Sequence, residues 1–348
     1  MRVETTLPLN DLRAVQAAAV AGEKAGYDSL ASVELANDPF FPLALAAVVT
    51  ERARLATGIA VAFPRSPMVV AQTAWDLHRS SGGRFDLGLG SQVKGHNERR
   101  FSVPWSAPVP RLREYVQALR AIWRCWEQGE PLQFEGEHYR FTLMTPEFSP
   151  PSTGFAPIPV SIAAVGPAMM KLAGRVCNGV RLHGFATRKY LEETCLPQIQ
   201  RGLEQAGRER GQFEITGGGF VVTGADEGAL RKAFEKIRYR IAFYGSTRSY
   251  HGVFAAHGWE ELGLKLHDMS KRGRWKQMAA EVPEDVVRTF SAVGTHDELP
   301  NAIEERFGGI ADNVEINVAD GTPLERVREL VQDVQRIGTP FHGHSEEW

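Results

Sequence analysis

Short apolar segments alternate with longer amphipathic segments along this chain, and this alternation restricts its fold more than any other feature. The longer segments have the periodicity of helices and include 67–80, 111–128, 167–176 and 323–337. The short segments have the length and composition of β-strands and lie at 3–7, 27–33, 54–62, 83–90, 159–163, 179–182, 213–223 and 314–318. One strand followed by one helix indicates a parallel sheet covered by helices. Eight such pairs predict an α/β protein with a (β/α)8 TIM barrel.

The chain is longer than a minimal barrel. Such a fold usually needs about 250 residues, whereas this sequence has 348. Two irregular stretches account for the excess, one after strand 4 at about 95–110 and one after strand 7 at about 245–285. We therefore expect a single domain over 1–340 with these two insertions. The polar tail, 341–348, is expected to be disordered.

The overall composition excludes several classes of function. Hydrophobic residues make up 43% and charged residues 24%, and the formal net charge is −2. This charge argues against a nucleic-acid partner or an anionic membrane surface. The first residues lack the apolar core of a signal peptide, and the apolar runs are too short to span a bilayer. We therefore expect a cytoplasmic protein without a membrane partner.

The cysteines and the terminal histidines do not indicate a metal centre. Cys125, Cys177 and Cys195 are widely spaced and include no CxxC pair. This spacing is typical of buried thiols in a reducing compartment and predicts neither a disulfide framework nor a zinc site. His342 and His344 lie in a polar terminus, where solvation is the commoner role.

A glycine-rich strand end at 83–97 is the first candidate binding element. Gly88 and Gly90 lack a Cβ atom, so another backbone or a flat ligand can approach the strand closely. A hydroxyl, an amide and a cation follow at 91–94, as a phosphate-bearing cofactor requires. A dinucleotide fingerprint would need a third glycine where Val93 stands, and no apolar helix follows. The alternative is a glycine-tightened strand without a ligand.

A second candidate element lies after the fifth strand. The residues at 164–166 are small and precede a helix that begins with Pro167. The free backbone N–H groups at such a helix start can bind a phosphate. The plainer interpretation is that these small residues only pack the strand against the helix. In a parallel barrel, both candidate elements lie at the same end, where active sites form.

Several motifs together resemble the bacterial luciferase-like superfamily, specifically its coenzyme F420-dependent oxidoreductase branch. They are the segments 25–30, 57–59, 67–72, 83–90, 163–167 and 173–180. The resemblance covers most of the chain. The motifs are specific for the superfamily but distinguish deazaflavin from FMN less well.

The resemblance implies positions for the cofactor. It implies a non-prolyl cis peptide between Gly58 and Ile59, in a bulge that backs the deazaflavin ring. It also implies that the ribityl and phosphate groups lie along Ser91, Gln92, Val93 and Lys94, with the phosphate end completed by Ala164, Val165 and Gly166.

The catalytic acid or base is less well defined by the sequence. Glu34 lies where relatives place an acid near the ring, but Leu35 stands where many relatives have a histidine. His183 ends a strand and could replace that histidine, or it could be a core histidine bonded to the backbone. Glu34 could act as a base if burial raised its pKa, or it could hold a backbone amide. Glu34 and His183 are the catalytic candidates.

The predicted function is hydride transfer between F420 and a small organic substrate that the sequence does not identify. One alternative keeps the fold but uses reduced FMN and oxygen, as a flavin monooxygenase does. Another is a cofactor- or ligand-binding protein without turnover. The resemblance also implies a homodimer.

Overall fold

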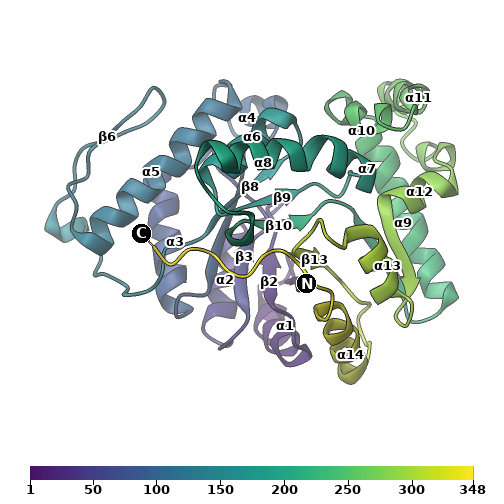
Figure 1. Cartoon of the computed structure of the whole chain (residues 1–348), viewed down its shortest axis with the longest axis horizontal. Helices are drawn as coiled ribbons and strands as arrows, with labels where there is room; N and C mark the ends of the chain where they lie inside the picture. Colours follow the sequence, from purple (N-terminus) through teal and green to yellow (C-terminus); the bar gives the residue numbers. More distant parts are fainter. Residues whose placement is uncertain (348) are drawn as a thin grey trace.

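Eight strands form one closed parallel barrel in the computed structural model, which describes residues 1–347 (Figure 1). Pairing between the third and fourth of these strands closes the barrel. In chain order the barrel strands are β1 (Arg2–Thr6), β2 (Ser29–Ser32), β3 (Arg54–Thr57), β5 (Phe85–Gly90), β8 (Val160–Ala164), β9 (Gly179–Leu182), β10 (Glu214–Gly217) and β13 (Asn313–Glu315). The predicted TIM barrel is confirmed.

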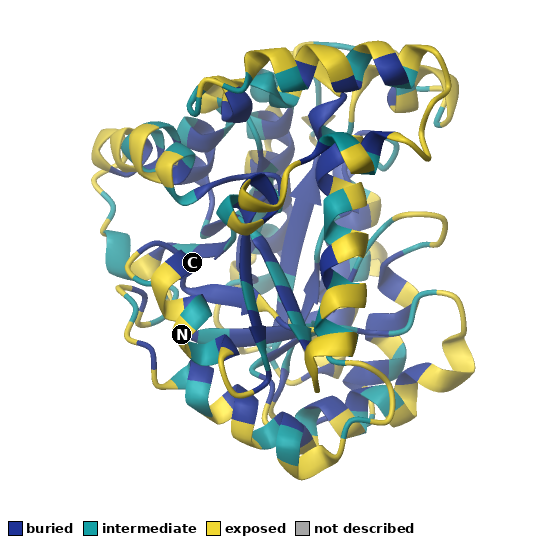
Figure 2. Cartoon of the chain, turned by 90° about the vertical axis from the view of Figure 1, so that its right-hand side faces the viewer, coloured by how far each residue is buried: buried dark blue, intermediate teal, exposed yellow. Residues whose placement is uncertain are grey.

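Helices cover the outside of the barrel, with buried inner faces and exposed outer faces (Figure 2). Local capping fixes several of their ends. The Asp11 carboxylate accepts the Arg13 N–H at the first helix start, and Gly26 ends that helix with φ 89°. The helices that follow the barrel strands are α1 (Leu12–Ala25), α2 (Phe40–Ala47), α3 (Pro67–Ser80), α5 (Pro108–Gln128), α6 (Pro167–Val176), α8 (Leu196–Gln205), α13 (Leu299–Phe307) and α14 (Leu324–Gln335).

The alternation within each strand separates an apolar layer from a polar lumen. On β5, Phe85, Leu87 and Leu89 are fully buried in the main hydrophobic core. Asp86 lies between them in sequence and forms an ion pair with Arg54 of the neighbouring strand β3. Because successive side chains point to opposite faces, the apolar side chains pack under the helices, and the charged ones lie inside the barrel.

The third predicted strand, 54–62, is interrupted in the structure. The Gly58–Ile59 peptide is cis, as the resemblance implied. It separates β3 from the short strand β4 (Ala60–Val61). The Thr57 hydroxyl holds the interruption against β5, since it donates to the Gly88 carbonyl at 2.7 Å and accepts the Gly88 N–H at 2.8 Å.

The predicted seventh strand, 213–223, is wrong as a single element. Gly217 and Gly218 adopt φ values of 77° and 97° and break it. The first half is β10 in the barrel. The second half, β11 (Phe220–Gly224), leaves the barrel and pairs in parallel with β12 (Ser291–Thr295), a strand that the sequence analysis missed.

The chain between β11 and β12 is mostly helical. A second hydrophobic cluster, which includes Phe185, Phe254 and Phe290, packs these helices against β11. The helices are α9 (Glu227–Gly245), which the Asp226 side chain caps, α10 (His251–Ala255), α11 (Glu260–Lys271) and α12 (Glu284–Phe290).

The remaining connections contain only small elements. A helix, α4 (Lys94–Arg99), follows β5, and the irregular chain after it leads into α5. A hairpin pairs β6 (Phe134–Glu135) with β7 (Arg140–Phe141) in antiparallel register. Between β9 and α8 lie α7 (Arg188–Tyr190) and one π-helical turn (Leu191–Cys195).

The C-terminal tail, for which the sequence indicated disorder, makes defined contacts in the structure. Phe341 is buried, and its N–H donates to the Asp312 carboxylate at 3.2 Å. The His342 N–H donates to the Gly211 carbonyl. Trp348 lies outside the described residues. Among residues 1–347, no helix is both long and apolar enough to cross a membrane.

Candidate functional site

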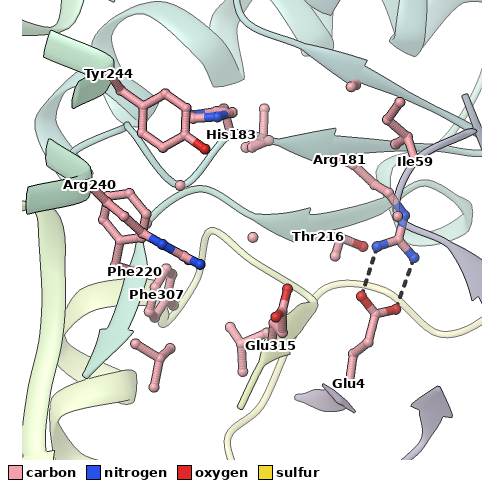
Figure 3. Close-up of a pocket in the computed structure, with 18 of the residues that line it drawn as sticks. Glu4, Ile59, Arg181, His183, Thr216, Phe220, Arg240, Tyr244, Phe307 and Glu315 are labelled. Atoms are coloured by element: carbon pink, nitrogen blue, oxygen red, sulfur yellow. Dashed lines mark hydrogen bonds and ion pairs between the residues drawn. The ribbon is translucent and has the colours of Figure 1, made fainter. Parts of the chain in front are cut away.

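A cavity of about 390 Å³ lies at the carboxyl end of the barrel strands. Residues from several strand ends line it, together with side chains from α9 (Figure 3). The lining residues labelled in Figure 3 are Glu4, Ile59, Arg181, His183, Thr216, Phe220, Arg240, Tyr244, Phe307 and Glu315. This is the end of a TIM barrel at which active sites form.

A buried ion pair forms the floor of this cavity. Arg181 Nη1 and Nη2 donate to the two Glu4 carboxylate oxygens at 2.8 and 2.9 Å (Figure 3). Ser29 adds a hydroxyl donor to Glu4 at 3.2 Å. Burial alone would lower the pKa of Arg181, but Glu4 outweighs burial and raises it. Arg181 therefore stays charged beneath the cavity.

Two glycines make room for Arg181 in the lumen. A Cβ atom on Gly88 would lie 3.0 Å from Arg181 Nε and 2.0 Å from the Thr57 carbonyl oxygen. A Cβ atom on Gly58 would lie 3.2 Å from Arg181 Nη1. The sequence had suggested that Gly88 allows a backbone or a flat ligand to approach. The structure gives this space to the Thr57 backbone and the Arg181 side chain.

The opposite wall comes from outside the barrel. Tyr244 and Arg240 extend from α9, and His183 follows β9 (Figure 3). The His183 ring lies edge-on to Tyr244, with centroids 4.4 Å apart. Phe220 of β11 also lines this wall. The cavity thus has an aliphatic side near Ile59 and a side with aromatic rings and hydrogen-bonding groups.

His183 is neutral at physiological pH. Burial, together with the positive charge of Arg240, lowers its pKa to about 4. Its Nδ1 atom accepts the Phe185 N–H at 2.9 Å. A neutral ring with Nδ1 as acceptor carries its proton on Nε2. His183 is therefore a hydrogen-bond donor through Nε2.

The structure brings five of the predicted site residues to the cavity and leaves six outside its lining. Gly58, Ile59, Ala164, Val165 and His183 line it. The residues outside the lining are Glu34, Ser91, Gln92, Val93, Lys94 and Gly166.

Glu34 is held by two partners. Its carboxylate accepts the Val61 N–H at 2.7 Å and pairs with Arg65 at 2.8 Å. The Glu34 N–H in turn donates to the Ile59 carbonyl at 3.2 Å. These contacts attach the tip of β2 to the chain that follows the cis peptide.

The segment 91–94 leads from β5 into α4. Gln92 has a φ of 56°, and its side chain accepts the Val93 N–H at 2.9 Å. The buried Asn97 donates to the Ser91 carbonyl at 2.9 Å. Lys94 remains 64% exposed, and its ammonium lies 3.9 Å from the Glu98 carboxylate. The segment therefore has a fixed backbone and a lysine whose ammonium is exposed to solvent beside Glu98.

The sequence analysis missed several residues of the site. Glu4 and Arg181 are charged residues in the middle of predicted strands. This unusual position was the one feature of the sequence that could have indicated a role inside the barrel. Their contact joins positions 177 residues apart. Tyr244 and Arg240 lie on a helix beyond the unexpected strand β11, so strand ends did not point to them.

Comparison with known proteins identifies the family of this chain. The family model described as luciferase-like monooxygenase matches residues 2–313. The chain belongs to the luciferase-like monooxygenase family. The uncharacterised protein Rv1360 of Mycobacterium tuberculosis is 42% identical over 337 residues, which cover 97% of this chain and 98% of Rv1360.

Two methanopterin enzymes are also similar to this luciferase-like protein. The 5,10-methylenetetrahydromethanopterin reductase of Archaeoglobus fulgidus is 28% identical over 76% of each chain. The coenzyme F420-dependent tetrahydromethanopterin reductase of Methanopyrus kandleri has the same fold, with a TM-score of 0.79 and 22% identity over 96% of this chain and 98% of that chain. Members of this family are oxidoreductases or monooxygenases.

The ion pair in the floor generates a stability prediction. We expect Glu4→Gln and Arg181→Met each to lower the free energy of unfolding by roughly 3–5 kcal/mol, because each leaves a buried group unpaired. The double variant should lose less than the sum of the two single variants. Urea unfolding measures all three, with the surface variant Glu325→Gln, which lies in an exposed pair with Arg328, as a near-neutral control. Additive losses would contradict a coupled pair.

His183 generates a prediction for pH dependence. Its pKa is about 4 in the folded protein and about 6.5 in an unfolded chain. Between these values only the unfolded state binds the proton, so His183 makes stability fall as the pH falls. We expect His183→Gln to flatten the pH dependence of unfolding in this window, by up to roughly 1.4 kcal/mol per pH unit. Parallel curves for variant and wild type would show that His183 is not held neutral.

Proposed function

We propose that this protein is an F420-dependent oxidoreductase that transfers a hydride between the deazaflavin and a small organic substrate. The cavity at the barrel mouth, backed by the Gly58–Ile59 bulge, is the observation that carries the proposal. Its volume of about 390 Å³ lies within the usual range for small-molecule sites, about 300–1,000 Å³. The resemblance to a reductase that uses F420 supports the same choice.

The residues around the cavity suit such a cofactor. Ile59, Ala164 and Val165 offer an aliphatic surface for a flat ring. Gly166 precedes α6, and a Cβ atom there would meet nothing within 4 Å, so the space beside this helix start is open. The exposed Lys94 supplies a cation for a phosphate or an acidic tail. When bound, the deazaflavin supplies the hydride chemistry.

The contribution of the chain is to position the reactants and to manage the substrate proton. We propose that His183 donates a hydrogen bond from Nε2 to the substrate, since its ring is neutral and lines the cavity. Glu34 stays a second candidate. Its carboxylate is engaged by Arg65 and the Val61 N–H, which suits a role in holding the bulge better than one in proton transfer.

Two alternatives use the same fold. A monooxygenase with reduced FMN and oxygen is consistent with the description of the family model. A ligand-binding protein without turnover is consistent with Leu35, an exposed side chain where many relatives have a histidine. The aliphatic and polar sides of the cavity favour a site for two reactants, a cofactor and a substrate, over a ligand-binding protein without turnover.

Cofactor titration separates these functions. We expect F420 to quench the tryptophan fluorescence of the protein at lower concentration than FMN does. Lys94→Ala should weaken F420 binding a few-fold, because it removes an exposed cation beside the proposed phosphate path. Lys24→Ala, at the far end of α1, is the matched control. Tight binding of FMN alone would favour the monooxygenase, and weak binding of both without turnover would favour the binding protein.

We also propose that the protein forms a homodimer through α2 and α3. Phe41, Val48 and Val69 are exposed on these adjacent helices and border a second cavity of about 540 Å³. Soluble monomers rarely expose a large contiguous apolar patch. A second copy would cover this surface with an identical apolar surface.

Sedimentation equilibrium tests the dimer. We expect about twice the mass of one chain for the wild type and a shift toward the monomer for Val48→Glu, which would bury a charge at the interface. Leu264→Glu changes another exposed apolar side chain, on α11, and should not alter the mass. A wild-type protein that sediments as a monomer would remove this proposal.

A further inference from the structure

A cluster of potential metal ligands lies outside the cavity at the barrel mouth. Glu114 of α5 meets Glu137 and His138 of the turn between β6 and β7. One ligand atom from each residue lies within 4.8 Å of the others. The β6–β7 hairpin extends away from the barrel beside α5 (Figure 1), and none of the three residues lines the barrel-mouth cavity.

Glu114 is a buried carboxylate without a counter-charge. It is 6% exposed, and its Oε2 atom accepts the His138 N–H at 2.8 Å. Within residues 1–347 no basic side chain lies at ion-pair distance from Glu114. Burial of an unpaired carboxylate is costly, so such groups are normally paired or coordinate a metal.

His138 provides an independent indication. Its Nε2 atom is buried and has no hydrogen-bond partner among the described residues. Most buried polar atoms have a partner, and an exception calls for an explanation such as an ion. An unpartnered imidazole nitrogen and an unpaired carboxylate thus occur together in one small cluster.

The backbone is fitted closely around the Glu114 carboxylate. A Cβ atom on Gly136 would lie 2.3 Å from Glu114 Oε2, so a side chain there would displace the carboxylate. Glu137 is exposed and can rotate toward the other two groups. The cluster therefore combines two ligands on a fixed frame with a third that is free to close on an ion.

We propose that Glu114, Glu137 and His138 bind a divalent transition-metal ion, with zinc as its representative. One imidazole nitrogen and two carboxylate oxygens suit zinc and its neighbours, whereas calcium and magnesium prefer oxygen ligands alone. Water completes the coordination on the exposed side. The bound ion would neutralise Glu114, satisfy His138 and fasten the hairpin to α5.

Calorimetric titration of the metal-stripped full chain with zinc chloride tests this site. We expect the cluster to bind one zinc ion per chain. Each of the substitutions Glu114→Gln, Glu137→Gln and His138→Gln should weaken this binding at least tenfold. Glu114→Gln keeps an acceptor for the His138 N–H, so the hairpin remains intact. Glu147→Gln, an exposed acid in the following loop, is the control.

Two further controls test for zinc bound by the terminal histidines and for variants that fail to fold. The titration is repeated in a His342→Gln/His344→Gln background, so that zinc held by the tail is not counted. Zinc should also raise the melting temperature of this background but not that of its Glu114→Gln derivative. If Glu114→Gln does not fold, the exposed Glu137→Gln decides the outcome alone. Absence of zinc binding, or binding that all three substitutions leave unchanged, would overturn the proposal.

Discussion

The arginine–glutamate pair across the barrel lumen is the interaction on which the rest of the site depends. Arg181 on β9 reaches Glu4 on β1, and its side chain passes the places where Gly58 and Gly88 lack a Cβ atom. TIM-barrel interiors are usually filled by branched apolar side chains. Here the charged Arg181 side chain fills part of the interior. Its burial is tolerable only because it is paired with both oxygens of the Glu4 carboxylate. The pair closes the lumen from below and leaves an open cavity above it.

The architecture was predictable because its signals are local. The alternation of Phe85, Leu87 and Leu89 with small or charged residues marks a strand with one face under helices. Asp11 and Gly26 mark the ends of a helix by their own chemistry. The error at 213–223 has the same origin. The apolar run in this segment predicts a single strand. Only the backbone angles at Gly217 and Gly218 show that the chain turns out of the barrel.

The candidate site was predictable only in part. Parallel strands bring their carboxyl ends together, so Ala164 and His183 were found from strand ends, whereas Ile59 was found from the family resemblance. Arg240 and Tyr244 come from a helix outside the barrel, and no local pattern places a helix face over a distant cavity. The cluster of potential metal ligands around Glu114 was not predicted for a related reason. Its members lie on a helix and a hairpin more than twenty positions apart in the sequence.

The two sides of the cavity divide it between two reactants in the function proposed above: the aliphatic side holds a deazaflavin ring, and the polar side is left for a substrate. A crystal structure of the protein soaked with F420 tests this arrangement. We expect the ring against Ile59 and the phosphate beside Ala164–Gly166, with the His183 side of the cavity free. Cofactor density away from the barrel mouth, or a ring stacked on the Phe220 side, would contradict it.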